Sequence, residues 1–285
     1  RIYGRGAADM KGALAAMIAS VKAIVESEVR LRGRLILTFV ADEEVTGYGT
    51  RDLIRRGYRA DFAIVGEPNE LNVQTAHKGV LWLKVVTRGK AAHASVPHQG
   101  VNAIYRMADI CLALEKMNSL LAGRKHSLLG SPTINVGTIK GGIKTNIVPD
   151  YCEITIDRRL IPGEKPIDVK QEIEETLESL GGKTSKLQFE LEVLNLAEPS
   201  ETPQDELIVQ VARKAVREVI GRDPGVTGFT ATCDMRFLVN EAGIPTIILG
   251  PGSLRQAHVI DEYVEVEQVI NAAKIYTSII LKTLS

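Results

Sequence analysis

The first part of the chain shows helical and strand-like patterns of apolar residues in turn. Apolar side chains recur at helical spacing over residues 10–27, which predicts a helix. The apolar run at 33–44 predicts a buried strand that leads into an acidic loop. Residues 48–57 predict a short helix, and residues 61–68 a second apolar strand that stops at a Glu-Pro pair. This alternation indicates an α/β layer with helices on a sheet.

The middle of the chain has a different order of elements. Its patterns predict a strand, a helix, two strands, a helix and a strand. The strands are expected at 80–89, 133–142, 150–160 and 187–195, and the helices at 102–117 and 167–181, the second with Gly181 as its C-cap. This β-α-β-β-α-β order is the ferredoxin-like pattern. We therefore expect an inserted domain of ordinary size here.

After this block the α/β pattern returns. An amphipathic helix is expected at 205–221, a short apolar strand with a glycine-rich end at 244–252, and a long closing helix at 265–284. The fold class predicted from these patterns is α/β, with one layer interrupted by an inserted domain.

Composition excludes several classes of partner. The 285 residues include 45% hydrophobic and 25% charged residues, which is ordinary for a globular protein. Lys+Arg and Asp+Glu both number 35, so we expect no nucleic-acid partner. No run of about 18 apolar residues occurs, so we expect no membrane partner. Three widely spaced cysteines match no metal motif and indicate free thiols in a reducing, cytoplasmic setting.

Acidic residues and one histidine stand where the predicted strands end. Ligands of open α/β sheets collect at the carboxyl ends of strands. The residues at these positions are Asp9 after a run of glycines, Asp42, Glu43 and Glu44 after the first strand, Glu67 after the second, and His258 after the strand near the C-terminus. Hard oxygen ligands and an imidazole at one edge would suit Zn²⁺ or a similar divalent ion.

Each of these residues also has a simpler interpretation. Asp9 alone is best explained as the cap of the following helix. An acidic triplet is usually a solvated loop, a Glu before Pro is usually part of a turn, and a single His is usually structural. A phosphate loop at Lys11 is rejected, because the GxxxxGK[ST] spacing is absent. Only the joint placement of these residues at strand ends favours a site.

Seven motifs follow one another in the order expected for one family. They are GRGAADMKG, ADEE, VGEP, GKAAHASVP, NIVPDYCEITIDRRLIPGE, TCDMRF and GPGSLRQAHVIDEY. Over nearly its whole length the chain resembles the acetylornithine deacetylase, succinyl-diaminopimelate desuccinylase, aminoacylase and carboxypeptidase G group of metallopeptidases. The resemblance implies a mixed-sheet, zinc-peptidase-like catalytic domain at 1–76 and 197–285. It also implies that 77–196 form a ferredoxin-like lid and dimerisation domain.

The resemblance assigns a role to each acidic motif. Asp9 looks like the carboxylate that bridges two metal ions, and Glu43 looks like the general base. Glu44 and Glu67 look like terminal ligands, one on each metal, with His258 as the imidazole partner of Glu44. The resemblance implies two divalent ions per subunit, zinc with cobalt or manganese as alternatives, that activate a water molecule held between them.

Residues of the inserted domain receive substrate roles in the same way. His93 looks like the histidine that reaches the site of a partner subunit and stabilises the oxyanion, which implies a homodimer. Asn146 and Arg159 match positions that hold the substrate backbone and carboxylate, and Gly252 is a further substrate-binding candidate.

The chain departs from the family pattern at its front. The family places an H-x-D pair upstream of the bridging aspartate, and its His is a metal ligand. No such pair lies between Arg1 and Asp9. We expect that segment to precede Arg1 in the full protein rather than to have been replaced.

These observations predict an enzyme that hydrolyses linear amides. The motif GPGSLRQAH is closer to the acetylornithine deacetylase branch, whereas TCDMRF is closer to other branches, so removal of an acyl group from an N-acyl amino acid is the first expectation. A di- or carboxypeptidase of the same family is the alternative. A non-catalytic, dimeric binding relative is a third interpretation, although it need not retain Glu43, Glu44, Glu67 and His258. A one-metal aminopeptidase is disfavoured, because H-E-x-x-H is absent.

Overall fold

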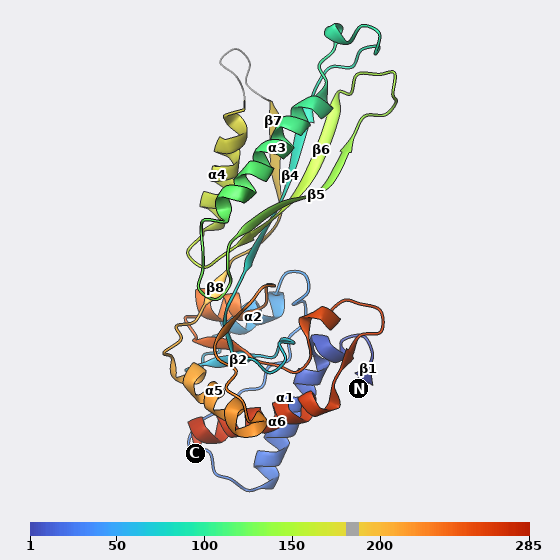
Figure 1. Ribbon diagram of the computed structural model, residues 1–285. Helices are drawn as coiled ribbons and strands as arrows, with labels where there is room; N and C mark the ends of the chain where they lie inside the picture. Colours follow the sequence, from blue (N-terminus) through green and yellow to red (C-terminus); the bar gives the residue numbers. More distant parts are fainter. Residues whose placement is uncertain (181–187) are drawn as a thin grey trace. The chain divides into compact units, whose positions relative to one another are not determined.

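The computed structural model describes residues 1–180 and 188–285. The described chain forms two compact units. Arg1–His77 and Ser200–Ser285 make the first unit, and Lys78–Pro199 make the second (Figure 1). No helix in the described residues is long and apolar enough to cross a membrane.

Four helices of the first unit confirm the helices predicted there. They are α1 (Gly12–Glu26), α2 (Tyr48–Arg55), α5 (Leu207–Ile220) and α6 (Val266–Leu284). The first begins two residues later than predicted, because Asp9 and Met10 have non-helical backbone angles. Residues buried from α5 and α6, such as Val216 and Ile279, pack into one apolar core with Ile247 and Leu249. Because the apolar residues of each helix recur with the helical period, each helix presents one apolar face to this core.

The sheet of the first unit is mixed. Its strands are β2 (Ala63–Val65), β3 (Gln74–His77), β8 (Ser200–Glu201), β9 (Thr227–Phe229) and β10 (Thr246–Ile248). The strand order is β2-β10-β3-β8, with β9 also paired to β3. β2 runs parallel to β10, whereas β10 and β3 are antiparallel. A separate antiparallel pair joins β1 (Ile2–Tyr3) to β11 (Tyr263–Val264). The predicted α/β class with a mixed sheet is therefore confirmed.

The buried strand predicted at 33–44 is wrong. Residues 34–40 form no ladder with any other part of the described chain, and Phe39 is 52% exposed. An apolar run indicates only that a segment could be buried in a sheet. A strand also needs a neighbour that satisfies its N–H and C=O groups, and the run itself does not encode that neighbour.

The second unit contains one antiparallel sheet covered by two helices. Its elements are, in chain order, β4 (Gly79–Arg88), α3 (Ala103–Leu121), β5 (Thr133–Gly141), β6 (Tyr151–Leu160), α4 (Pro166–Glu178) and β7 (Phe189–Ala197). All six overlap the predicted elements, and the strand order is β5-β6-β4-β7. Buried and half-buried residues alternate along β6, as a strand with one covered face requires. The predicted C-cap at Gly181 lies outside the described residues.

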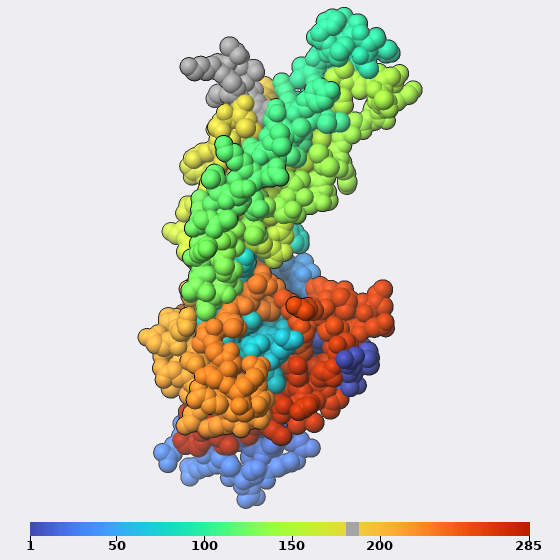
Figure 2. All heavy atoms as spheres, in the orientation of Figure 1, coloured from blue at the N-terminus to red at the C-terminus, as the bar shows by residue number. Residues whose placement is uncertain are grey.

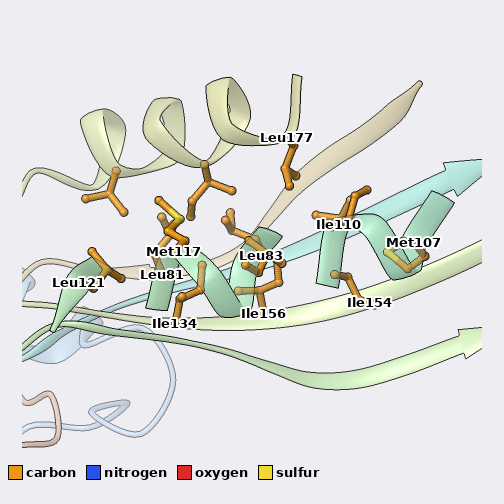
Figure 3. Close-up of a cluster of buried hydrophobic side chains, with 14 of the residues drawn as sticks. Leu81, Leu83, Met107, Ile110, Met117, Leu121, Ile134, Ile154, Ile156 and Leu177 are labelled. Carbon is orange, nitrogen blue, oxygen red and sulfur yellow. The ribbon is translucent and has the colours of Figure 1, made fainter. Parts of the chain in front are cut away.

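Both helices bury apolar side chains on the same face of this sheet. Met107 and Ile110 of α3 and Leu177 of α4 meet Leu83 and Ile156 of the strands in one core (Figure 3). Helix α3 lies lengthwise along the unit, as the green spheres of Figure 2 show. The side chain of Asn102 begins this helix by accepting hydrogen bonds from two backbone N–H groups of its first turn.

Candidate metal centre and active site

The loops after β2 and β10 leave the same edge of the first unit's sheet. The two strands are parallel, so their carboxyl ends lie together. Glu67 follows β2, and His258 lies in the segment after β10. Asn69 joins the two loops: its side-chain amide donates to the Ile248 carbonyl at 2.9 Å, and its side-chain oxygen accepts the Gly250 N–H at 3.0 Å. The frame that carries both predicted ligands is thus fixed by buried hydrogen bonds.

Three of the predicted metal ligands meet at this edge. One ligand atom each from Asp9, Glu44 and His258 lies within 4.8 Å of the others. His258 Nε2 is 3.2 Å from Asp9 Oδ2 and 3.0 Å from Glu44 Oε2. Two carboxylate oxygens and one imidazole nitrogen are a donor set that suits Zn²⁺ and related divalent ions. The residues present therefore fit a metal ion.

Glu43 and Glu44 are neighbours that face different surroundings. A turn just before α2 carries both: the Asp42 carbonyl accepts the N–H groups of Thr46 and Gly47 at 3.2 and 2.7 Å. The Glu44 side chain is 47% exposed and contacts His258, whereas Glu43 is half-buried. The Glu44 carboxylate is thus available as a ligand, whereas the Glu43 side chain is partly shielded from water.

Glu43 is a weaker acid than an ordinary glutamate. Burial, followed by the repulsion of the nearby Asp234 carboxylate, raises the pKa of Glu43 to about 7. Asp234 is itself buried, and its Oδ2 accepts a 2.6 Å hydrogen bond from the Thr50 hydroxyl. Burial also raises the pKa of Asp234. A base whose pKa lies near neutrality can both accept and return a proton at physiological pH.

Glu67 lies deeper than the other predicted ligands. It is only 6% exposed, and it is not part of the close group formed by Asp9, Glu44 and His258. Burial, and then repulsion from Glu43 and Asp9, raises the pKa of Glu67 well above its usual value. Burial likewise raises the pKa of Asp9. Buried carboxyls that repel one another are costly unless a cation compensates them, so this grouping favours a bound metal.

The predicted oxyanion donor, His93, lies in the second unit. Its Nδ1 accepts the backbone N–H of Ser95 at 3.2 Å and lies 2.7 Å from the Ser95 hydroxyl. In the neutral ring this leaves the proton on Nε2. His93 also pairs through its backbone with Ile147, and the Ala94 N–H donates to the Asn146 carbonyl at 3.1 Å. Two of the predicted substrate-site residues, His93 and Asn146, therefore sit on adjoining loops.

Arg159, another residue of the second unit, lies on strand β6. Its guanidinium makes two hydrogen bonds to the carboxylate of Asp157, at 2.7 and 2.9 Å. The side chain is thus held in the fork geometry that also suits a substrate carboxylate. Its assignment to substrate binding stays a prediction.

Gly252 lies against the Asp9 loop. Its backbone has a φ of +91°, and a Cβ there would come within 3.2 Å of the Ala8 Cβ. Its N–H donates to Gln268 Oε1 at 2.6 Å, and its carbonyl accepts the Glu70 N–H at 2.7 Å. Packing and conformation explain a glycine here, and its role toward substrate stays a prediction.

The profile of the peptidase family M20/M25/M40 matches residues 1–282. The chain belongs to this family. It is 31% identical over 274 residues to the acetylornithine deacetylase of Myxococcus xanthus, a match that covers 95% of this chain and 69% of that protein. It is also 31% identical to a Bacillus subtilis N-formyl-4-amino-5-aminomethyl-2-methylpyrimidine deformylase, with 98% and 71% covered.

A solved structure supports the same conclusion about the fold of this M20 member. The aminopeptidase PepT from Bacillus cereus superposes with a TM-score of 0.79 at 27% identity, covering 96% of this chain and 70% of that one. The family is one of metal-dependent hydrolases, so the chain is a metal-dependent hydrolase. The family resemblance and the enzyme class predicted from sequence are thereby confirmed.

Two acidic residues of the site were not singled out from the sequence. Asp234 is 5% exposed beside Glu43, and Glu262 is 2% exposed beside the Asp9 loop. Both stand inside motifs that carry the family resemblance, TCDMRF and GPGSLRQAHVIDEY. No local sequence pattern distinguishes them from other acidic residues. What sets them apart is that they are buried, which is rare for a carboxylate and becomes known only from the structure.

Proposed function

We propose that this hydrolase removes the acyl group from an N-acyl amino acid, with two divalent metal ions, zinc in the first instance, bound per chain. Asp9 would bridge the ions, with Glu44, Glu67 and His258 as further ligands. The proposal is supported by the similarity to an acetylornithine deacetylase and to a deformylase, both of which remove an acyl group.

A single observation carries the proposal. The close group of Asp9, Glu44 and His258 stands beside Glu43, the residue whose pKa is raised to about 7. A metal ligand set with a half-buried carboxylate beside it supplies the two groups that amide hydrolysis needs, a Lewis acid and a general base. Bound divalent ions supply Lewis acidity that polarises a carbonyl and makes water more acidic.

Two residues then have separate roles in the reaction: Glu43 transfers protons and His93 stabilises the developing negative charge. Glu43 takes the proton of the attacking water and later delivers it to the leaving nitrogen. His93 of a second subunit would donate a hydrogen bond from its Nε2–H to the oxyanion that forms on the carbonyl oxygen. A preorganised donor of this kind typically contributes about 3–4 kcal/mol to transition-state stabilisation.

Residues of the second unit would hold the substrate. We assign the substrate carboxylate to Arg159, whose fork geometry permits two parallel hydrogen bonds where Lys would permit only a point contact. Asn146 would bind the substrate backbone, and Gly252 of the first unit is a further substrate-binding candidate. In the absence of substrate, Arg159 forms its ion pair with Asp157, and the substrate carboxylate would replace Asp157 as the partner of Arg159.

We further propose that the chain is organised as a catalytic domain, 1–76 and 197–285, and a ferredoxin-like lid and dimerisation domain, 77–196. The β-α-β-β-α-β order and the strand order β5-β6-β4-β7 support this assignment. Strand β5 has a neighbour on one side only within the described residues, and such an edge suits pairing with a second copy. The enzyme would be a cytoplasmic homodimer, in keeping with its three free cysteines.

Peptide hydrolysis is the second candidate. The resemblance to PepT, an aminopeptidase at 27% identity, favours it. Both reactions break an amide bond, so they use the same metal ligands and base and differ in what occupies the acyl side.

A substrate panel distinguishes the two. Purified protein with added Zn²⁺, Co²⁺ or Mn²⁺ is assayed against N-acetyl, N-formyl and N-succinyl amino acids and against di- and tripeptides. The expected result is a higher kcat/KM on one N-acyl amino acid than on any peptide, with activity abolished by a chelator and restored by metal. Preferred cleavage of peptides would select the peptidase. Glu26→Gln, an exposed change on α1, is the control for preparation effects.

A further inference from the structure

We propose that Glu262 is a positioning residue that braces the metal-ligand loops of Asp9 and His258 against each other. The inference rests on the proposed metal site and adds to it a residue that touches no metal. Glu262 stands four positions after His258, on the loop that carries this histidine, and its carboxylate reaches the loop that carries Asp9.

The carboxylate of Glu262 is saturated by donors from the Asp9 loop. Its Oε1 accepts the N–H groups of Ala8 and Asp9 at 2.9 and 3.0 Å. Its Oε2 accepts the N–H of Gly6 at 2.8 Å and the Arg5 guanidinium at 3.3 Å. One buried side chain therefore fixes the backbone at and before Asp9 through three main-chain contacts.

The short ladder between β1 and β11 sets the register of this brace. Tyr3 pairs with Tyr263, and the Gly4 N–H donates to the Glu262 carbonyl at 2.9 Å. The main chain of Glu262 is thus tied to the strand that leads into the Asp9 loop, and its side chain to the loop itself. A slip of one residue would point the carboxylate to the opposite face of the ladder.

A carboxylate is the group that this position requires. The Asp9 loop precedes α1, and the N–H groups of Gly6, Ala8 and Asp9 donate to the Glu262 carboxylate instead of to carbonyls of a preceding turn. Four donors converge on Glu262, and an acceptor-only group with two oxygens can satisfy all of them. Ionisation is favoured too: although burial acts against it, the donors at Asp9, Gly6 and Ala8 keep the pKa of Glu262 below its usual value.

The brace extends to a third predicted ligand through Arg5. The Arg5 guanidinium contacts Glu262 Oε2 and Glu44 Oε1, both at 3.3 Å. Asp9, His258 and Glu44 are therefore linked to one buried carboxylate without the aid of a metal. Mutation of a residue that holds metal ligands in place without contacting the metal usually lowers metal affinity or activity by roughly 10- to 100-fold.

The test is Zn²⁺ affinity of Glu262→Gln, measured by competition with a chromophoric chelator. The side-chain oxygen of Gln can still accept hydrogen bonds from the N–H groups of Ala8 and Asp9. Its NH₂ group, however, faces the Gly6 N–H and the Arg5 guanidinium, which are also donors, so two of the four hydrogen bonds are lost. We expect Zn²⁺ binding weaker by roughly 10- to 100-fold. At saturating Zn²⁺, kcat should recover toward the wild-type value. The matched control is Glu265→Gln, which removes the same charge three residues away at an exposed ion pair with Arg1.

A general loss of stability must be separated from a loss of positioning. Tyr276→Phe removes a buried 2.6 Å hydrogen bond to the Leu249 carbonyl, in the core rather than at the site. It should lower Tm and leave Zn²⁺ affinity unchanged. If it weakens Zn²⁺ binding as much as Glu262→Gln does, Glu262 acts through stability alone and the brace is refuted.

The remaining outcomes are distinct. If the wild-type protein binds no divalent ion, the proposed function fails first. If it binds Zn²⁺ and Glu262→Gln binds it equally well, only the brace is overturned. Should the variant not fold, amide hydrogen exchange of the metal-free wild type decides: the N–H groups of Gly6, Ala8 and Asp9 should exchange slowly, and rapid exchange at all three overturns the inference.

Discussion

His258 Nε2 lies 3.2 Å from Asp9 Oδ2, although the two residues come from opposite ends of the chain. The first unit is built from both of these chain ends, with the whole second unit between them in sequence. Neither end alone contains the close group of three ligands. The site therefore forms only when the segment around His258 has folded onto the Asp9 loop.

Replacing the imidazole should therefore weaken metal binding. His258→Ala removes the one nitrogen donor among the three close ligands, and we expect it to lower Zn²⁺ affinity by at least tenfold, since the remaining donors are carboxylates. Equilibrium competition with a chelator measures this. His98→Ala, at an exposed position of the second unit, should leave the affinity unchanged. Equal affinities for His258→Ala and wild type would remove His258 from the ligand set.

Glu43→Gln should separate catalysis from metal binding. Glutamine keeps the size of the side chain but cannot accept the proton, so turnover should fall by roughly 10²- to 10⁴-fold. Metal content should stay at the wild-type value, because Glu43 is assigned as base and not as ligand. Steady-state rates and elemental analysis of the same sample measure both quantities.

The same variant tests whether the two glutamates have been assigned correctly. If Glu43→Gln loses metal while Glu44→Gln keeps it, the roles of base and ligand are exchanged between these neighbours. Glu26→Gln should match the wild type in both rate and metal content.

The metal-free protein should lose stability as pH rises through the range in which Glu43 ionises. The pKa of Glu43 is about 7 in the folded chain against an ordinary value of 4.5. Between these values only the folded state holds the proton, so the contribution of Glu43 to folding becomes less favourable as pH rises from 4.5 to 7. The total effect is on the order of 3 kcal/mol at most.

Glu43→Gln isolates this contribution. In the presence of a chelator, the variant should have a higher Tm than the wild type at pH 8, and the two should converge near pH 4.5. Excess Zn²⁺ should raise the wild-type Tm at pH 8, because a ligand that binds only the folded state stabilises it. A Tm difference that does not change with pH would show that Glu43 titrates normally.

Apart from the strand expected at 33–44, long elements were predicted well from the sequence and short ones poorly. Helices such as α5 and strands such as β6 contain enough periodic positions to reveal a buried face. β3, β8 and β9 were missed, because QTAH, SE and TGF are short and contain no such pattern. These strands are defined by their neighbours in the sheet, which local sequence does not specify.

The sequence likewise predicted one part of the site and not another. The order of the motifs brought Asp9, Glu44 and His258 into one hypothesis, and the structure brings these three together. It was not possible to foresee that Glu262 would accept three backbone N–H groups, since that depends on the register of β1 and β11. Such contacts are a product of tertiary packing rather than of residue type.

An ion-pair cluster after α5 should give the opposite pH dependence to that of Glu43. Hydrogen bonds from Arg213, the Gly225 N–H and Arg217 lower the pKa of Asp223 to about 2. Because the folded pKa is below the unfolded one, the stabilisation is complete above the ordinary pKa of 3.8 and is lost as pH falls toward 2.

Asp223→Asn should thus lower Tm at pH 7, and the difference from wild type should close near pH 2. The cluster is at the surface, so high salt should reduce the difference as well. Asp61→Asn, another exposed aspartate of the first unit, serves as the control. If the deficit of Asp223→Asn is the same at pH 7 and pH 2, the pKa of Asp223 is not lowered.

Action of His93 on the site of a second subunit can be tested by mixing inactive variants. His93→Ala and Glu43→Gln should each have low activity as pure homodimers. In a mixed dimer, one site combines the intact Glu43 of one chain with the intact His93 of its partner, and the other site lacks both. Random exchange of equal amounts makes half of the dimers mixed, so about one quarter of wild-type activity should return. If His93 serves its own chain, no site in the mixture has both residues and activity stays low. Exchange must be verified with differently tagged chains, and recovery should require it: activity that returns before exchange would show that one of the two variants is not truly inactive.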